Sequence, residues 1–300
     1  MIRMRQSGDG VTDEDLARVY LVTGASRGIG RETVLMLAEP GVGLVLCARA
    51  RGPLEAVAAE CRERGARVLV VPTDVREDEA VEAAFDQART QLGRIDGVVH
   101  CAAVLAYGRF EDVPADVWES SVTTTLGGAA RVARQALNAF ADRDYGRLVF
   151  VGSILGKMAV PGMSSYVTAK WGLQGLVRTL QVEARATPGI GVSMVSPAGV
   201  DTEIYRLAGT YLGRHGQPPP PVASPARVAK EIVRLLETPR REVNVGPFNW
   251  IMVTGFRLMP GLYDRLVTPL MSRIALAKEP VGPNPGNVLE PIADEAVVRR

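Results

Sequence analysis

The chain has 300 residues, of which 47% are hydrophobic, and its formal net charge is +2 at pH 7. This length allows one large α/β domain or two small ones, and the hydrophobic fraction is ample for a buried core. The 35 basic and 33 acidic residues nearly cancel and are spread along the chain. The composition therefore gives no indication that nucleic acid or an acidic lipid surface is the main partner.

The N-terminal part and the cysteines bear on the cellular compartment. We interpret residues 1–17 as a polar tail, and residues 1–15 lack the apolar core of a signal peptide. No uninterrupted apolar run approaches the length that a bilayer span needs. The three cysteines, Cys47, Cys61 and Cys101, are scattered, and no Cys/His spacing indicates zinc, so we expect no metal. A reduced, cytoplasmic setting is predicted.

From residue 18 onward, apolar runs alternate with helical patterns. The runs are 19–23, 44–47, 68–71, 98–101, 148–151, 192–195 and 242–245, and the helical stretches are 30–38, 53–64, 78–91, 118–140, 165–185 and 225–236. Most runs lack period-2 alternation, which indicates strands buried on both faces. The pattern predicts an α/β fold over residues 18–246, a doubly wound parallel sheet of about seven strands with helices on both faces.

A glycine-rich loop follows the first apolar run. Gly24, Gly28 and Gly30 stand at GxxxGxG spacing between a predicted strand and a predicted helix. Glycines permit a tight turn and close backbone approach, and the free N–H groups of the helix start can face a pyrophosphate. The loop therefore predicts a dinucleotide site. Its assigned cofactor-binding residues are Gly24, Ser26, Arg27, Gly28, Ile29 and Gly30.

The charge at the end of the second strand selects between the two nicotinamide cofactors. An acidic residue there would bind the ribose hydroxyl of NAD and repel a 2′-phosphate. This chain has Arg49 instead, together with Arg27 in the glycine loop. Both could pair with a phosphate through charge-assisted hydrogen bonds, which favours NADP(H). The competing interpretation is that both arginines are simply solvated.

Asp74, after the third strand, has two interpretations. It could cap the following helix with Glu77 as its capping-box partner, or it could hydrogen-bond the adenine of the cofactor. The two roles are compatible, and the sequence favours the cap.

A second motif predicts proton transfer. Tyr166 and Lys170 are four residues apart in a helical pattern, so they share one face. A tyrosine has a pKa of about 10, too high for efficient acid–base work near neutrality, and a nearby ammonium lowers it. Ser153 follows a buried strand, where site residues of such sheets gather, and could hold a substrate oxygen. A Tyr/Lys pair alone is common on helices, but these three residues downstream of a nucleotide loop are much more specific.

With these motifs in this order, the chain resembles the short-chain dehydrogenase/reductase family, of the simple type with a Rossmann-type fold. The matching features are TGxxxGxG at 23–30, Asp74, Ser153, YxxxK at 166–170 and the segment 197–202. The resemblance covers about residues 18–246. It implies that Tyr166 is the general acid/base, that Ser153 orients the carbonyl, and that Lys170 binds the nicotinamide ribose and tunes Tyr166.

The resemblance also extends the cofactor site. It places Val200 and Thr202 by the carboxamide of the cofactor and the segment 203–222 over the substrate. The further residues assigned to the cofactor are Val75, Ala102, Tyr166, Lys170, Pro197, Val200 and Thr202. Tyr205, Tyr211 and the prolines of the covering segment hint at an apolar pocket for the substrate.

The chain departs from the family at three places, one of which is Ala198, where members commonly have Gly. The segment 100–103 reads His-Cys-Ala-Ala where members usually carry Asn-Asn-Ala-Gly, and we interpret His100 as a strand residue packed near the adenosine side. Thr125 stands where the family has an Asn that helps organise a water relay to the lysine. Threonine retains the main-chain carbonyl but not the amide, so Thr125 is included among the catalytic candidates and the rate of catalysis is in question.

The C-terminal extension, residues 247–300, has an apolar part at 248–276 and a Pro/Gly-rich part at 279–291. Packing on its own subunit or a neighbour is the role we favour for the apolar part. A lid over the substrate and an interfacial membrane helix are the alternatives, and Pro260-Gly261 weakens the last one. The resemblance implies a homodimer or homotetramer formed through the helices that hold Thr125 and Tyr166.

These observations predict an NADP(H)-dependent oxidoreductase that interconverts a ketone or aldehyde and an alcohol, with a small and fairly apolar substrate. The alternative is an NADP(H)-binding sensor or scaffold with weak or no catalysis, suggested by Thr125 and by the altered segment 100–103.

Overall fold

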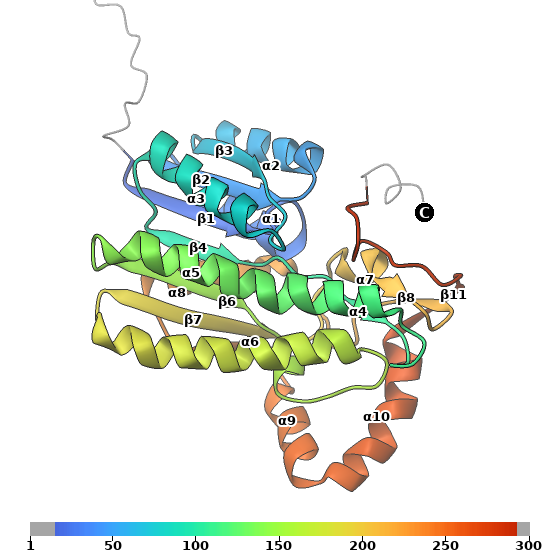
Figure 1. The fold of residues 1–300 in the computed structure, drawn as a ribbon. Helices are drawn as coiled ribbons and strands as arrows, with labels where there is room; N and C mark the ends of the chain where they lie inside the picture. Colours follow the sequence, from blue (N-terminus) through green and yellow to red (C-terminus); the bar gives the residue numbers. More distant parts are fainter. Residues whose placement is uncertain (1–15, 293–300) are drawn as a thin grey trace, which may run out of the picture.

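The computed structural model describes residues 16–292, and a seven-stranded parallel sheet lies at its centre (Figure 1). Its strands are β1 (Arg18–Thr23), β2 (Val42–Ala48), β3 (Arg67–Pro72), β4 (Gly97–His100), β6 (Gly146–Val151), β7 (Ile190–Pro197) and β10 (Glu242–Val245). They are ordered β10-β7-β6-β4-β1-β2-β3 across the sheet. The predicted strands and their parallel arrangement are confirmed, whereas most of the predicted tail lies outside the described residues.

Helices cover both faces of this sheet, as predicted (Figure 1). The helices of one face are α3 (Asp78–Leu92), α5 (Gly128–Ala141) and α6 (Ser164–Glu183), and those of the other are α1 (Gly28–Leu37), α2 (Arg51–Glu63) and α8 (Pro225–Glu237). The prediction of a single helix at 118–140 is wrong in one respect, because the segment is not one continuous α-helix. It consists of α4 (Ala115–Val122) and α5 joined by a π-helical turn, Thr123–Gly127, in which Gly128 N donates to Thr123 O. Such turns are frequent at functional sites.

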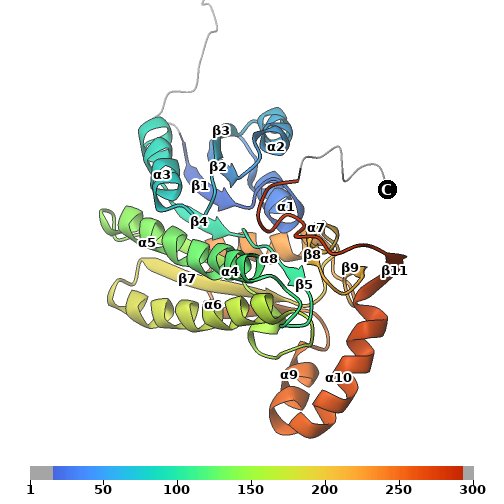
Figure 2. The same cartoon turned by 45° about the vertical axis from the view of Figure 1, so that its right-hand side comes forward.

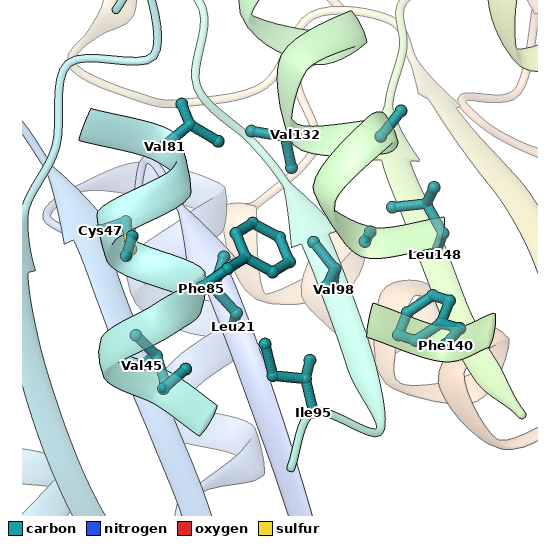
Figure 3. Close-up of a cluster of buried hydrophobic side chains, with 14 of the residues drawn as sticks. Leu21, Val45, Cys47, Val81, Phe85, Ile95, Val98, Val132, Phe140 and Leu148 are labelled. Atoms are coloured by element: carbon teal, nitrogen blue, oxygen red, sulfur yellow. The ribbon is translucent and has the colours of Figure 1, made fainter. Parts of the chain in front are cut away.

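The absence of alternation in the strands reflects two separate apolar layers. Leu21 packs into the layer under α3, α5 and α6, while the next residue, Val22, packs into the layer under α1, α2 and α8. Figure 3 shows the first layer, where Phe85 of α3 points toward Leu21 and Val98 of the sheet. Because consecutive residues of a strand point to opposite faces, burial of both faces makes most positions of the central strands apolar.

The extension folds back onto the rest of the molecule. Helices α9 (Asn249–Leu258) and α10 (Pro260–Ile274) form a helical hairpin that projects from the body, and β11 (Leu276–Pro280) pairs with β9 (Arg214–Gly216) (Figure 1). Before β9 in the chain, α7 (Ile204–Leu207) precedes β8 (Gly209–Thr210), which pairs with β5 (Ala106–Tyr107). After β11 the chain runs back past β8 toward α1 (Figure 2). Within residues 16–292, no helix is long and apolar enough to cross a membrane.

The strand order fixes where a ligand can bind. Strand β1 lies between β2 and β4, so the chain winds in one direction from β1 to β3 and in the other from β4 to β10. Ligands of open parallel sheets bind beyond the carboxyl ends of the strands at this reversal. Gly24 and Ala102 follow β1 and β4, so they lie at this crevice.

Candidate active site

The glycine loop is packed tightly against the segment after β4. Gly24 has φ +68°, and a Cβ at this position would come within 2.9 Å of the main-chain nitrogen of Ala102. Only glycine satisfies both the left-handed backbone conformation and this close approach. The glycine loop therefore forms the sharp turn between β1 and α1 that the GxxxGxG spacing predicts.

The loop lines a cavity of about 200 Å³, here called the glycine-loop cavity. Its lining includes these residues assigned to the cofactor from the sequence: Gly24, Ser26, Arg27, Gly28, Ile29, Gly30, Arg49, Asp74, Val75, Ala102 and Thr202. The ends of β1, β2, β3 and β4 thus bring together residues that are far apart in the sequence. Thr124 Oγ1, which also lines it, is buried and has no hydrogen-bond partner among the described residues.

The helix-capping role expected for Asp74 is wrong. Helix α3 begins at Asp78 after Glu77, and no side chain caps it. Asp74 instead accepts hydrogen bonds from the main-chain nitrogen of Arg76, at 2.9 Å, and from its guanidinium, with Nη2 2.6 Å from Oδ2. Burial raises the pKa of Asp74, but the hydrogen bonds and charge of Arg76, with the charge of Arg49, bring it below its ordinary value. No sequence motif singled out Arg76.

Arg49 is a partly buried cation at the edge of this cavity. Burial is the main cause that lowers its pKa. Its Nη2 donates to the main-chain carbonyl of Asn287 at 2.6 Å. Asn287, Pro291 and Ile292 also line the glycine-loop cavity. These C-terminal residues were not predicted from the sequence, because a Pro/Gly-rich composition does not indicate where a segment packs.

Ser153, Tyr166 and Lys170 line a second, larger cavity of about 470 Å³, here called the tyrosine cavity. Ser153 follows β6, whereas Tyr166 and Lys170 lie one turn apart on α6. Further residues assigned to the cofactor also line it, namely Ile29, Pro197, Val200 and Thr202. The two cavities share the lining residues Ile29, Cys101, Ala103, Thr202 and Ile204, so they are the two ends of one groove.

The electrostatics of Tyr166 are dominated by burial. Burial raises its pKa well above the ordinary value, the neighbouring Tyr205 adds to the rise, and the hydrogen bond with Ser153 opposes it. Lys170 Nζ lies 5.5 Å from the centroid of the Tyr166 ring and donates to Val151 O at 2.8 Å. The lowering of the Tyr166 pKa that we expected from Lys170 is not found, because burial raises this pKa and Lys170 is not among the groups that shift it. Burial also lowers the pKa of Lys170, to about 8.

Thr125 lies in the π-helical turn and is buried. Its hydroxyl accepts a hydrogen bond from Val104 N at 3.3 Å and donates to Val104 O at 3.2 Å. It does not line either cavity. In this structure, the Thr125 side chain therefore holds the loop after β4 and does not face Ser153, Tyr166 or Lys170.

His100 is a buried strand residue, as interpreted. Its Nδ1 lies 2.9 Å from Thr23 Oγ1 in a hydrogen bond, and its ring packs at a tilt against Phe150. Burial and then the charge of Lys170 lower its pKa to about 3. The charge of Lys170 contributes to this shift, so His100 lies within reach of Lys170, whereas its expected place near the adenosine stays a prediction.

The wall opposite Tyr166 is apolar and is formed largely by segments outside the sheet. Tyr205 and Pro219 to Pro221 line the tyrosine cavity, as expected for the covering segment. The similar expectation for Tyr211 is wrong, because Tyr211 packs against the cluster that contains Val104 and Val288. Tyr211 is held there by the pairing of β5 with β8, in which its N–H donates to Tyr107 O.

The helical hairpin completes this wall. Side chains from both helices line the tyrosine cavity, among them Asn249, Met252, Leu262 and Leu266. Phe256 packs edge-on against Trp171 of α6 and Tyr263 of α10, and Tyr263 donates a hydrogen bond to Ala159 O at 2.6 Å. The extension thus packs on its own chain and lines the cavity at the same time.

Comparison with known proteins agrees with this arrangement. A family model described as short chain dehydrogenase matches residues 18–210. The uncharacterized oxidoreductase YxnA of Bacillus subtilis is 30% identical over 277 residues, covering 91% of this chain and 77% of that protein. Cis-4-hydroxycyclohexanecarboxylate dehydrogenase of Sinomonas cyclohexanicum is 34% identical, covering 73% of this chain and 88% of that protein.

Two solved structures share the fold. An actinorhodin polyketide ketoreductase variant with NADPH superposes with a TM-score of 0.67 at 28% identity, covering 79% of this chain and 98% of that chain. An alcohol dehydrogenase from Thermococcus sibiricus, complexed with 5-hydroxy-NADP, gives a TM-score of 0.66 at 27% identity, covering 76% and 95%. The family model spans more than half of the chain, and the seven-stranded sheet is the one these neighbours share. The protein is therefore a member of the short chain dehydrogenase family of oxidoreductases.

Proposed function

We propose that this protein is an NADP(H)-dependent oxidoreductase that interconverts a ketone or aldehyde and the corresponding alcohol. The observation that carries the proposal is the single groove in which Ser153, Tyr166 and Lys170 line one end and Arg49 lines the other. A proton-transfer group beside a dinucleotide cradle suits redox chemistry at a carbonyl.

The residues present fit the cofactor. The glycine loop forms a cradle at a helix N-terminus, where free N–H groups favour a pyrophosphate. Arg49 and Arg27 are the cations for a 2′-phosphate, and Pro197, Val200 and Thr202 line the tyrosine cavity at the nicotinamide end. When bound there, NADP(H) supplies or accepts the hydride.

The protein side chains move the proton and hold the oxygen. In reduction, the Tyr166 hydroxyl donates its proton to the carbonyl oxygen, and in oxidation its phenolate removes the alcohol proton. The raised pKa keeps the phenol protonated and ready to act as the acid. The Ser153 hydroxyl donates a hydrogen bond to the same substrate oxygen, and the Lys170 ammonium offsets the phenolate charge that remains after proton transfer.

We infer that the substrate is a small and largely apolar carbonyl compound or alcohol. The tyrosine cavity is lined by Met158, Met163 and Leu155 from the body of the molecule, and by the apolar inner face of the hairpin. The relatives named as a polyketide ketoreductase and as a hydroxycyclohexanecarboxylate dehydrogenase support a carbonyl compound or an alcohol as the substrate. A lining of mostly apolar side chains with a few polar groups is typical of small-molecule pockets.

A carbonyl panel tests the proposal. With NADPH as the reductant, at least one apolar ketone or aldehyde should be turned over by the protein. The Tyr166→Phe variant should retain NADPH binding and lose at least a hundredfold in kcat, because the proton donor is removed. Full turnover in that variant would show that Tyr166 is not the acid.

The second candidate function is an NADP(H)-binding sensor or scaffold, and Thr125 in place of the family's Asn favours it. Tight NADPH binding without turnover over the panel, combined with gain of turnover in the Thr125→Asn variant, would select this candidate. Turnover in the native chain would select the oxidoreductase.

Assembly and compartment stay predictions. A homodimer or homotetramer formed through α5 and α6 is expected from family membership, and light scattering would measure it. Cys47, Cys61 and Cys101 are free thiols, which agrees with the predicted reduced cytoplasmic setting.

A further inference from the structure

Residues 284–292, here called the strap, follow β11 and run past β8 toward α1 (Figure 2), and they contribute lining residues to the glycine-loop cavity. Its first half is firmly anchored. Asn284 and Thr210 exchange two main-chain hydrogen bonds of 2.8 and 3.0 Å, and Asn287 N donates to Leu207 O at 2.8 Å. Val288 is fully buried against Val104 and Val117. These contacts fix the path of the strap over the body of the molecule.

One glycine is required for this path. Gly286 has φ +57°, and a Cβ there would collide with main-chain atoms of Leu207 and Ala208. A side chain at this position would lift the strap from its anchor. The crossing is therefore specified by the sequence.

From Asn287 onward, main-chain carbonyls of the strap accept hydrogen bonds from three arginines. Arg49 Nη2 lies 2.6 Å from Asn287 O, Arg76 Nη2 lies 3.1 Å from Leu289 O, and Arg27 Nη2 lies 3.3 Å from Ile292 O. Two of these arginines, Arg27 and Arg49, are those assigned to the 2′-phosphate. The strap thus presents main-chain acceptors to the cations at this end of the groove.

The strap lines the cavity but does not fill it. Asn287, Pro291 and Ile292 are lining residues, together with the glycine loop and Asp74. Asn287 Oδ1 is buried and accepts no hydrogen bond from the described residues. A buried acceptor at a cavity wall is suited to a donor on a ligand. A guanidinium has five N–H donors, so the strap carbonyls leave other donors of Arg49 for a phosphate.

We infer that the strap is part of the cofactor site. It encloses the adenosine half of NADP(H), Asn287 Oδ1 accepts a hydrogen bond from a donor of that half, and residues 289–292 lift when the cofactor exchanges. This inference rests on the proposed NADP(H) binding. In the opposite case, the strap would compete with the cofactor for the arginines. The experiments below distinguish enclosure from competition.

The first measurement uses the native chain and hydrogen exchange. Enclosure predicts that saturating NADPH slows exchange at the strap amides of Leu289 and Glu290, because the part of the strap that lifts then opens less often. Faster exchange with NADPH would mean that the cofactor displaces the strap, and unchanged exchange would mean that the two do not meet. Either result overturns the inference.

The second measurement compares two shortened chains by NADPH fluorescence. A chain ending at Val288 keeps the buried anchor and the contact of Asn287 with Arg49, and it loses the segment that faces Arg76 and Arg27. A chain ending at Ile292 is the matched control. The chain ending at Val288 should release NADPH at least tenfold faster and bind it more weakly, while the control matches the native chain. Equal release rates or tighter binding in the chain ending at Val288 would overturn the inference.

Full-length variants cover the case in which the shortened chain folds poorly. Gly286→Val should accelerate NADPH release in the same direction, and Asn287→Ala should weaken NADPH binding by roughly fivefold to tenfold through loss of one acceptor. Native affinity in both variants would again overturn the inference. Failure of the native chain to bind NADPH at all would instead refute the proposed function, so the two failures are distinguishable.

Discussion

At the scale of single residues, the proposed preference for NADP(H) rests on Arg49. In the Arg49→Asp variant, NADPH affinity should fall by about 1–3 kcal/mol, because a charge-assisted hydrogen bond is lost and a carboxylate faces the 2′-phosphate. The affinity for NADH should be retained, since an acidic residue there can bind the ribose hydroxyl. Fluorescence titration with both cofactors measures the difference.

Arg51→Asp is the matched control for this prediction. Arg51 is two residues away, and its side chain is 63% exposed and pairs only at the surface with Glu55. Its replacement should change NADPH affinity little, because an exposed pair contributes little. Equal losses in the two variants would point to a general charge effect and would remove Arg49 from its specific role.

His100 predicts a pH dependence of stability. Its pKa is about 3 in the folded chain and about 6.5 in an unfolded one. Between these values the unfolded state binds a proton that the folded state does not, so stability is fully present above pH 6.5 and is lost as the pH falls. The loss approaches about 1.4 kcal/mol per pH unit for one proton.

The His100→Asn variant should therefore show a flatter curve between pH 6 and 4. Urea unfolding at several pH values measures the free energy of unfolding of both chains. Asp74 and Asp96, whose pKa values are lowered, contribute at lower pH and do so in both chains. Parallel curves from pH 6 to 4 would contradict the assignment.

At the scale of elements, the strands were predictable because burial of both faces leaves an apolar run that few other structures produce. The break between α4 and α5 was not, since a π-helical turn needs one extra residue in a turn and no particular residue type. The Asp74 prediction failed for a similar reason. Asp74 and Glu77 fit a capping box by spacing, but Arg76 between them binds the carboxylate and the helix begins later.

Loosening the hairpin should change the tyrosine cavity, where the substrate is proposed to bind, without weakening cofactor binding. Phe256 joins α9 to α6 and α10 through two edge-on ring contacts with centroid distances of 6.2 and 5.2 Å. Each ring pair contributes about 0.5–1.5 kcal/mol, so Phe256→Ala should speed hydrogen exchange in both helices of the hairpin by roughly tenfold. NADPH affinity should change little, because the arginines and glycines proposed for the phosphates line the glycine-loop cavity, which no hairpin residue lines.

Leu258→Ala provides the control for the hairpin, since its side chain is 74% exposed and does not line the cavity. It should leave both exchange and NADPH affinity near native values. If Phe256→Ala weakened NADPH binding as much as it loosened the hairpin, the separation of the groove into two functional ends would be wrong.

At the scale of the whole molecule, the candidate site combines parts with and without a sequence signature. The glycine loop, Ser153, Tyr166 and Lys170 carry their chemistry in side chains or in required glycines, and sequence spacing reveals them. The strap acts mainly through main-chain carbonyls, which every residue has, so its position emerges only when the chain is folded. The apolar hairpin was visible as a segment, but its inner and outer faces became distinguishable only when the tyrosine cavity was defined.

The groove joins the two halves of the sheet, and this makes a prediction for global unfolding. The glycine loop follows β1 in one half, whereas Tyr166 and Ser153 follow β6 in the other. A cofactor that binds only the folded groove stabilises the folded state by about 2.7 kcal/mol at a free concentration 100 times its Kd. Because both halves contribute residues, calorimetry with NADPH should show one transition that moves to higher temperature as a unit, and the shift should be smaller in Arg49→Asp. Two transitions, of which NADPH moves only one, would mean that the cofactor binds one half of the sheet without the other.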